Sequence, residues 1–243
     1  MNAGKPGLLT RVLGRGAPVA AGSTAVTVAQ PWQPPPVRSP VPRARLVYAF
    51  DATWSRHHAW AAAQKLQDRL LAVLPGQLEV ALAWHSGGEV TFSKFTSNPA
   101  RLRDQAAGVK CVAGTTQLLP ILERVAARDR AAVVLYVGDC FEEDERRAAR
   151  IADKLRLRET RVIILHDGPP PDAFAVITER TGGALLPFDT SALDRLGDLL
   201  QAVAVLAVGN VELVEAQKAA LPAASLLLEN LDPKRLLIGR AKS

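Results

Sequence analysis

Apolar runs that suit buried strands alternate with amphipathic stretches along the middle of the chain, over about residues 45–208. The runs "RLVYAF" (45–50), "AAVVLYVGD" (131–139) and "RVIILHDG" (161–168) are almost continuously apolar, which is typical of strands covered on both faces in a parallel sheet. Between the strands, stretches such as "HHAWAAAQKLQDRLLAVL" (57–74) repeat their apolar residues at helical spacing. This alternation predicts a doubly wound α/β domain with a mostly parallel sheet and helices on both faces.

One pair of segments departs from the continuous apolar pattern. "QLEVALAWH" (77–85) and "EVTFSKF" (89–95) alternate apolar and polar residues on either side of "SGG", which predicts an antiparallel hairpin at the edge of the sheet. The other predicted elements are helices over 98–108, 116–128, 142–158, 170–183 and 189–209, and a short strand over 184–188.

The N-terminal segment differs in composition from this domain. Residues 1–44 contain eight of the 17 prolines, which remove backbone donors and disfavour helix, so we expect a disordered, basic, proline-rich arm. Residues 1–45 carry six basic side chains and no acid, and the remaining chain has 24 of each sign. The net charge of +6 therefore comes from the arm together with Arg45, the first residue of the predicted domain. Its sparse charges favour a solubilising role over contact with nucleic acid or anionic lipid, and no specific nucleic-acid partner is expected.

The C-terminal tail, residues 209–243, contains "NVELVEAQKAALPAASLLLENL", which predicts a helix broken at Pro222. Its apolar patches indicate docking, either on the domain or on a partner. The longest apolar run, "AVAVLAVG" (202–209), is far shorter than the ~20 residues of a membrane helix, and no secretory signal is expected. Because Cys111 and Cys140 are the only cysteines and form no metal-type pair, we expect a reduced, cytoplasmic protein.

Oxygen-bearing side chains gather where the predicted parallel strands end. The turn "DATWS" follows the first strand, "GD" closes the strand over 131–139, and "AGTTQLL" precedes the helix over 116–128. Ligands of open parallel sheets bind outside the carboxyl ends of the strands. Carboxylates and hydroxyls, with no soft donor expected nearby, suit a hard cation such as Mg²⁺, which keeps part of its water shell.

The segments "FDATWS", "AGTTQL" and "VVLYVGD" resemble the metal-ion-dependent adhesion site (MIDAS) of von Willebrand factor type A (VWA) domains. The resemblance lies in the order of the segments, their positions relative to the strands and their spacing. The resemblance covers about residues 45–208 and is strongest to bacterial, cytoplasmic single-domain members. It implies a Mg²⁺ or Mn²⁺ site whose ligands, some through water, are Asp51, Thr53, Ser55, Thr116 and Asp139. Thr115 is the alternative to Thr116, which is preferred because the family's threonine is followed two positions on by an aliphatic residue, here Leu118.

Each of these features also has a purely structural interpretation. Thr53, which stands where the family usually has serine, or Ser55 could cap the helix that follows, and Asp139 could cap the helix over 142–158. The occurrence of all three features at strand ends in the right order favours the metal site. Cys140 is expected to be a small buried filler rather than a reactive thiol.

The histidines are not expected to bind the ion. His57 and His58 should lie on the surface at a helix start, and His85 and His166, at strand ends, should be satisfied or solvent-facing. Trp54, inside the first turn, is either buried against the next helix or exposed as an interface anchor.

The favoured function is a non-enzymatic binding module, in which an Asp or Glu of a partner protein fills an open position on the ion. By resemblance, the partner belongs to an ATPase or chaperone machine, and the protein serves as an adaptor in a larger intracellular assembly. A Mg²⁺-dependent phosphoester hydrolase is the first alternative, although the sequence offers no general base besides the ligands themselves. The second alternative is a structural scaffold with an unused metal site, in which the arm or the tail recruits the partner.

Overall fold

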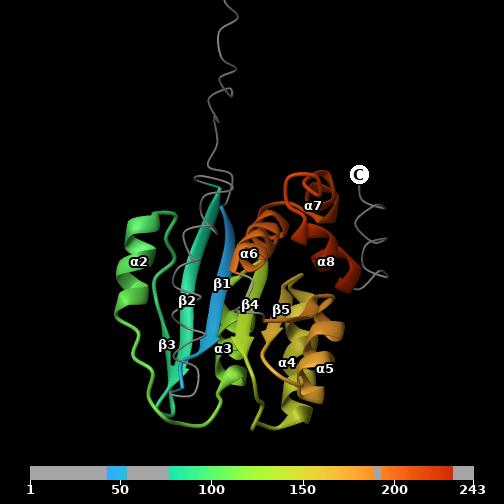
Figure 1. Ribbon diagram of the computed structural model, residues 1–243. Coiled ribbons are helices and arrows are strands. Elements are labelled where there is room, and N and C mark those ends of the chain that lie inside the picture. Colours follow the sequence, from blue (N-terminus) through green and yellow to red (C-terminus); the bar gives the residue numbers. More distant parts are fainter. Residues whose placement is uncertain (1–42, 54–76, 189–192, 232–243) are drawn as a thin grey trace, which may run out of the picture. The chain divides into compact units, whose positions relative to one another are not determined.

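The computed structural model describes residues 43–53, 77–188 and 193–231 of the chain. Its strands form one sheet in the order β3-β2-β1-β4-β5-β6, with helices on both faces (Figure 1). The strands are β1 (Ala44–Asp51), β2 (Leu78–Ser86), β3 (Glu89–Phe92), β4 (Val133–Gly138), β5 (Arg161–His166) and β6 (Ala184–Pro187). The helices are α2 (Pro99–Ala107), α3 (Leu118–Arg124), the π-helical turn η2 (Val125–Asp129), α4 (Glu145–Leu157), α5 (Asp172–Thr181), α6 (Leu193–Val208), α7 (Val211–Ala216) and α8 (Ala223–Asn230).

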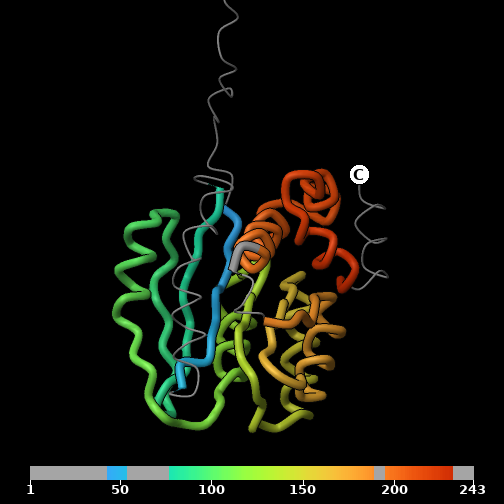
Figure 2. The backbone as a smooth tube through the Cα atoms, in the orientation of Figure 1, coloured from blue at the N-terminus to red at the C-terminus, as the bar shows by residue number. Residues whose placement is uncertain are grey.

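The sheet is parallel except at one edge. β1 lies between β2 and β4 and pairs in parallel with both (Figure 2). Among the described strands, only β3 runs antiparallel, paired with β2 across a turn at Gly87 and Gly88. Both glycines have positive φ, 60° and 83°, the backbone conformation that suits a two-residue hairpin turn. The predicted α/β fold with one antiparallel edge hairpin is confirmed.

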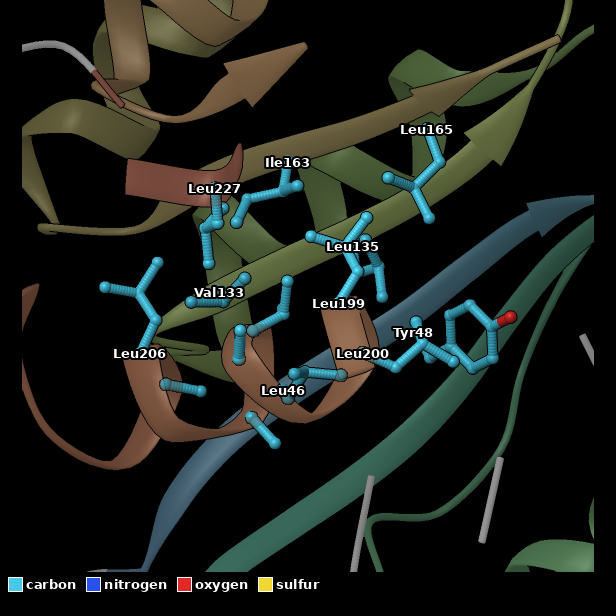
Figure 3. Close-up of a cluster of buried hydrophobic side chains, with 14 of the residues drawn as sticks. Leu46, Tyr48, Val133, Leu135, Ile163, Leu165, Leu199, Leu200, Leu206 and Leu227 are labelled. Carbon is cyan, nitrogen blue, oxygen red and sulfur yellow. The ribbon is translucent and has the colours of Figure 1, made fainter. Parts of the chain in front are cut away.

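Alternating side chains of the strands build two hydrophobic cores, one on each face of the sheet. Along β1, Leu46, Tyr48 and Phe50 belong to a core that also holds residues of α2, α6, α7 and α8. Val47 and Ala49 belong to the other core, with residues of α3, α4 and α5. Figure 3 shows the first core, in which strand side chains meet those of α6 and α8. Because both faces are covered, these strands are continuously apolar in sequence.

Most described helices lie where the sequence predicts them. α2 begins after Asn98, whose side chain accepts hydrogen bonds from two N–H groups of the first turn. α5 is followed by Gly182 in the left-handed conformation. The predicted helix over 116–128 starts later, because α3 begins at Leu118, and it continues into the π-helical turn η2. The predicted helix over 57–74 lies outside the described residues.

The tail forms two short helices, α7 and α8, instead of one helix interrupted at Pro222. Pro222 directly precedes α8, where its φ of −55° suits a helix start. Apolar side chains of both helices, including Val214 and Leu227, are buried in the core that contains α6. The domain boundaries at residues 44 and 208 stay a prediction. Among the described helices, none combines the length and the hydropathy that crossing a membrane requires.

Candidate metal centre

Two acidic side chains lie at the same edge of the sheet. Asp51 is the last residue of β1, and Asp139 directly follows β4. The register pairs Phe50 with Val137 across these two neighbouring parallel strands, so both strands end at the same level, at the lower edge of the sheet in Figure 1. This is the edge at which open α/β sheets bind their ligands.

A pocket of about 290 Å³ opens at this edge. Three segments build it: the turn after β1, the loop before α3 and the segment after β4. The lining residues are Asp51, Thr53, Ala113, Gly114, Thr116, Asp139, Cys140 and Glu142. The structure therefore brings four of the five predicted ligands to one pocket, whereas Ser55 lies outside the described residues. Their assignment as metal ligands stays a prediction.

Backbone hydrogen bonds fix the turn after β1. Asp51 and Thr53 are almost fully buried, with 3% and 8% of their surface exposed. The Thr53 N–H donates to Asp51 Oδ1 at 2.8 Å, and the intervening Ala52 N–H donates to the His85 carbonyl at 3.0 Å. The turn therefore supplies one hydrogen bond that orients the Asp51 carboxylate.

The loop before α3 presents Thr116, and not Thr115, to the pocket. Thr116 is buried and lines the pocket, whereas Thr115 is exposed and lies outside the lining. Glu142, from the segment after β4, accepts a hydrogen bond from the Thr116 N–H at 2.8 Å. The Thr116 hydroxyl lies 3.0 Å from the Cys140 sulfur.

Glu143 caps α3 from the segment after β4. The residue before α3, Gln117, makes no capping hydrogen bond with its side chain, and the Glu143 carboxylate instead accepts from the Leu119 N–H at 2.9 Å. Burial raises the pKa of Glu143, and the hydrogen bonds from N–H groups of α3 oppose this rise. Glu143 and Glu142 together hold the loop before α3 against the segment that follows β4.

The β2–β3 turn supports the same loop from the other side. A Cβ at Gly114 would lie 2.7 Å from the Gly88 nitrogen, so the close approach of the two backbones requires glycine at this position. The Gln117 side chain donates to the Gly88 carbonyl at 2.8 Å. The loop that carries Thr116 is thus held between the hairpin and the segment after β4.

His85 is fully buried next to Asp51. Its Nδ1 lies 3.7 Å from Asp51 Oδ1, beyond hydrogen-bond distance, and has no hydrogen-bond partner among the described residues. Its Nε2 shares a hydrogen bond of 3.1 Å with the Tyr136 hydroxyl. Burial lowers the pKa of His85, although the nearby carboxylates, Asp51 first, oppose this shift. The expectation that His85 is satisfied therefore holds for Nε2 and not for Nδ1. His166 lies outside the pocket lining, and its Nδ1 forms a hydrogen bond with the Gly168 carbonyl.

The donor set fits a divalent cation. One oxygen of Asp51, one oxygen of Asp139 and the sulfur of Cys140 all lie within 4.8 Å of one another. The hydroxyl-bearing residues Thr53 and Thr116 line the same pocket. Carboxylate and hydroxyl oxygens suit Mg²⁺ or Mn²⁺, and the sulfur adds a donor for a softer ion.

Among the lining residues whose side chains carry donor atoms, Cys140 and Glu142 were not predicted as site residues. Cys140 is exposed, so the expectation of a buried filler, and of no soft donor near the site, is wrong. The signal available in the sequence is its position directly after Asp139. The capping alternative for Asp139 is also wrong, because α4 begins after Asp144, whose side chain caps the helix.

No protein-family model matches the sequence, and no curated protein matches it either. Solved structures do match. The von Willebrand factor type A protein from Catenulispora acidiphila has a TM-score of 0.53 at 14% identity, over 67% of this chain and 43% of that chain. BatB from Bacteroides thetaiotaomicron has a TM-score of 0.52 at 14% identity, over 63% of this chain and 95% of its own. Proximal thread matrix protein 1 from the mussel byssus, with a zinc-occupied MIDAS motif, has a TM-score of 0.54 at 14% identity, over 67% of this chain and 46% of that chain.

This chain has the VWA fold. At these identities the likeness establishes the fold and no more. The chain spans less than half the length of the Catenulispora and mussel proteins that it matches. Within the VWA fold, the pocket is lined by described residues of the three segments whose sequences resemble a MIDAS.

Proposed function

We propose that this protein is a metal-dependent protein-binding module. A bound Mg²⁺ or Mn²⁺ supplies an open coordination position for an Asp or Glu carboxylate of a partner protein. Asp51 and Asp139 would hold the ion through their carboxylates, and Thr53 and Thr116 would contribute hydroxyls directly or through water. The convergence of these four side chains on one open pocket carries the proposal.

The charges of the pocket explain why binding would depend on the ion. Asp51 and Asp139 place two negative charges around one small space, and Glu142 adds a third at its rim. Without a cation, these carboxylates repel an approaching acidic side chain. With a divalent cation, the charges of the two aspartates are balanced, and a partner carboxylate can approach.

Binding is favoured over catalysis by the lining of the pocket. Glu142 is the lining carboxylate that is not assigned to the ion, and it already accepts a hydrogen bond from the Thr116 N–H, which favours a role in holding the loop over one as general base. His85 is buried behind Asp51. The zinc-occupied MIDAS motif of the mussel protein supports a metal site in this fold. The resemblance to cytoplasmic VWA proteins further supports an adaptor role in an intracellular assembly, with an ATPase or chaperone component as the partner.

A matched pair of peptide libraries tests this function. Fluorescence anisotropy would compare mixed-sequence peptides that carry a central Asp with the same peptides carrying Asn, each in Mg²⁺, in Mn²⁺ and in chelator. We expect binding of the Asp library in metal only, and its loss in Asp139→Asn. Asp172→Asn is the control, because Asp172 is exposed at the start of α5 and lies outside the pocket lining.

Two results would contradict the proposed function. Equal binding of the Asp and Asn libraries would show that no carboxylate is recognised. Binding of the Asp library that persists in chelator, or in the folded Asp139→Asn variant, would show that the pocket and its ion are not needed.

A further inference from the structure

The pocket holds one donor that an all-oxygen site does not have. The Cys140 sulfur lies within 4.8 Å of carboxylate oxygens of both Asp51 and Asp139. We propose that the Cys140 thiolate joins these two carboxylates as a third protein ligand and makes the centre selective for a thiophilic divalent ion, Zn²⁺, over Mg²⁺. This inference rests on the metal site of the proposed function and names its ion.

The separations are compatible with one zinc ion. With Zn–S bonds of about 2.3 Å and Zn–O bonds of about 2.0–2.2 Å, the ligand atoms of a tetrahedral site lie roughly 3.3–3.7 Å apart. The three atoms here lie within 4.8 Å of one another, so shifts of about 1 Å among the three side chains would bring them to these separations. Three protein ligands leave the fourth position open for a partner carboxylate.

A buried nitrogen without a partner among the described residues lies next to Asp51, one of these ligands. His85 is 0% exposed, its Nδ1 has no hydrogen-bond partner among the described residues, and it lies 3.7 Å from Asp51 Oδ1. An unpaired buried nitrogen is costly, and carboxylates that bind metals are commonly oriented by a further hydrogen bond. An approach of about half an ångström would let His85 Nδ1–H donate to Asp51 Oδ1, with Nε2 accepting from the Tyr136 hydroxyl. Asp51 would then have a second hydrogen bond that orients its carboxylate.

Cys140 would lose its thiol proton to solvent as its sulfur bonds the ion. The S–H bond breaks, a sulfur lone pair forms the bond to zinc, and no oxidant or reductant is required. The Thr116 hydroxyl, 3.0 Å from the sulfur, would then donate a hydrogen bond to the thiolate. Mg²⁺ gains nothing from this sulfur because it prefers oxygen ligands, so selectivity follows from the single residue after Asp139.

Cobalt(II) provides a test with a spectroscopic readout, because Co²⁺ occupies zinc sites and a cobalt–thiolate bond absorbs in the near ultraviolet whereas cobalt–oxygen bonds do not. The wild-type chain and the variants Cys140→Ser and Cys111→Ser would each be titrated with Co²⁺. The bound cobalt would then be displaced with Zn²⁺ or with Mg²⁺ to measure the affinity for each ion. Cys111 is the matched control, as the other cysteine of the chain and one that lies outside the pocket lining. Circular dichroism would confirm that each variant is folded.

We expect the thiolate band in the wild type and in Cys111→Ser, and its absence in Cys140→Ser. Zinc affinity should fall by at least about tenfold in Cys140→Ser, with Mg²⁺ affinity unchanged within about twofold. A wild type without the band, or a Cys140→Ser variant that keeps its zinc affinity, would overturn the inference and leave the Mg²⁺-dependent function standing. If the folded wild type bound neither Zn²⁺ nor Mg²⁺ nor Mn²⁺, both would fail.

Discussion

Tyr136→Phe removes the hydroxyl that satisfies the buried imidazole next to Asp51. Tyr136 is fully buried, and its hydroxyl forms the 3.1 Å hydrogen bond to His85 Nε2. Burial raises the pKa of Tyr136 well above its usual value, so the hydroxyl keeps its proton at neutral pH. Phenylalanine retains the ring and its edge-to-face contact with Phe174, at 5.9 Å between ring centroids. The substitution therefore changes one hydrogen bond and little else.

The expected loss of stability follows from what is left unpaired. With His85 Nδ1 already lacking a partner among the described residues, the variant would leave neither ring nitrogen bonded. A buried polar group that loses its partner costs about 1–3 kcal/mol. For a domain of this size, each kcal/mol lowers Tm by about 2–4 °C.

A double-mutant cycle separates this cost from general disturbance of the core. Urea unfolding would be measured for the wild type, Tyr136→Phe, His85→Leu and the double variant. Because replacing both partners removes the unpaired groups altogether, the double variant should be more stable than the sum of the single effects implies, by about 1–2 kcal/mol. A Tyr136→Phe variant as stable as the wild type would show that this hydrogen bond does not stabilise the fold. Additive changes in the free energy of unfolding would show that the two side chains are not coupled.

Three further predictions concern the supports of the pocket. Glu143→Ala should lower the free energy of unfolding by about 1 kcal/mol, because it removes the cap of α3, and Glu143→Gln should restore part of the loss, as measured by urea unfolding. Hydrogen bonding to Arg147 lowers the pKa of Glu123, so this pair stabilises the fold above the ordinary glutamate pKa and ceases to do so as the pH falls through the lowered value. Glu123→Gln should therefore cost at most about 1 kcal/mol at pH 7, the range of an exposed pair, and in an acid titration this cost should shrink as the pH falls through the lowered pKa of Glu123. Gly114→Ala should displace the loop from Gly88, at a cost of about 1–3 kcal/mol, and weaken ion binding in calorimetry; unchanged ion affinity would show that this packing does not position the site.

The sheet was predictable because burial on both faces leaves a continuous apolar signature in each strand. β4 and β5 are buried over nearly their whole length. The alternating pattern of β3 reflects its place at the edge, where it pairs with β2 alone among the described strands. The helix starts were less predictable. Asp139 and Asp144 are both acids placed before the same helix, and only the three-dimensional path of the chain shows that Asp144 is the cap.

The sequence could predict where the site lies, because strand ends mark it, but it could not predict the side-chain contacts within the site. The positions of Asp51 and Asp139 follow from the ends of adjacent parallel strands, which the apolar pattern marks. The contacts of Glu142 and Cys140 with Thr116 join residues 26 and 24 positions apart, and no local pattern indicates such a pairing. The same holds for His85, whose approach to Asp51 depends on the register between β1 and β2.

Calorimetric titration of Mg²⁺ and Mn²⁺ into the full chain, beside Asp51→Asn and Asp139→Asn, tests whether the pocket binds an ion through its two aspartates. Asparagine keeps an oxygen that can accept the Thr53 N–H bond now made by Asp51, so the variants should remain folded. We expect one saturable site in the wild type that both substitutions abolish. Saturable binding that survives both substitutions would place the ion elsewhere, and a folded wild type that binds neither ion would rule out the proposed Mg²⁺- or Mn²⁺-dependent function.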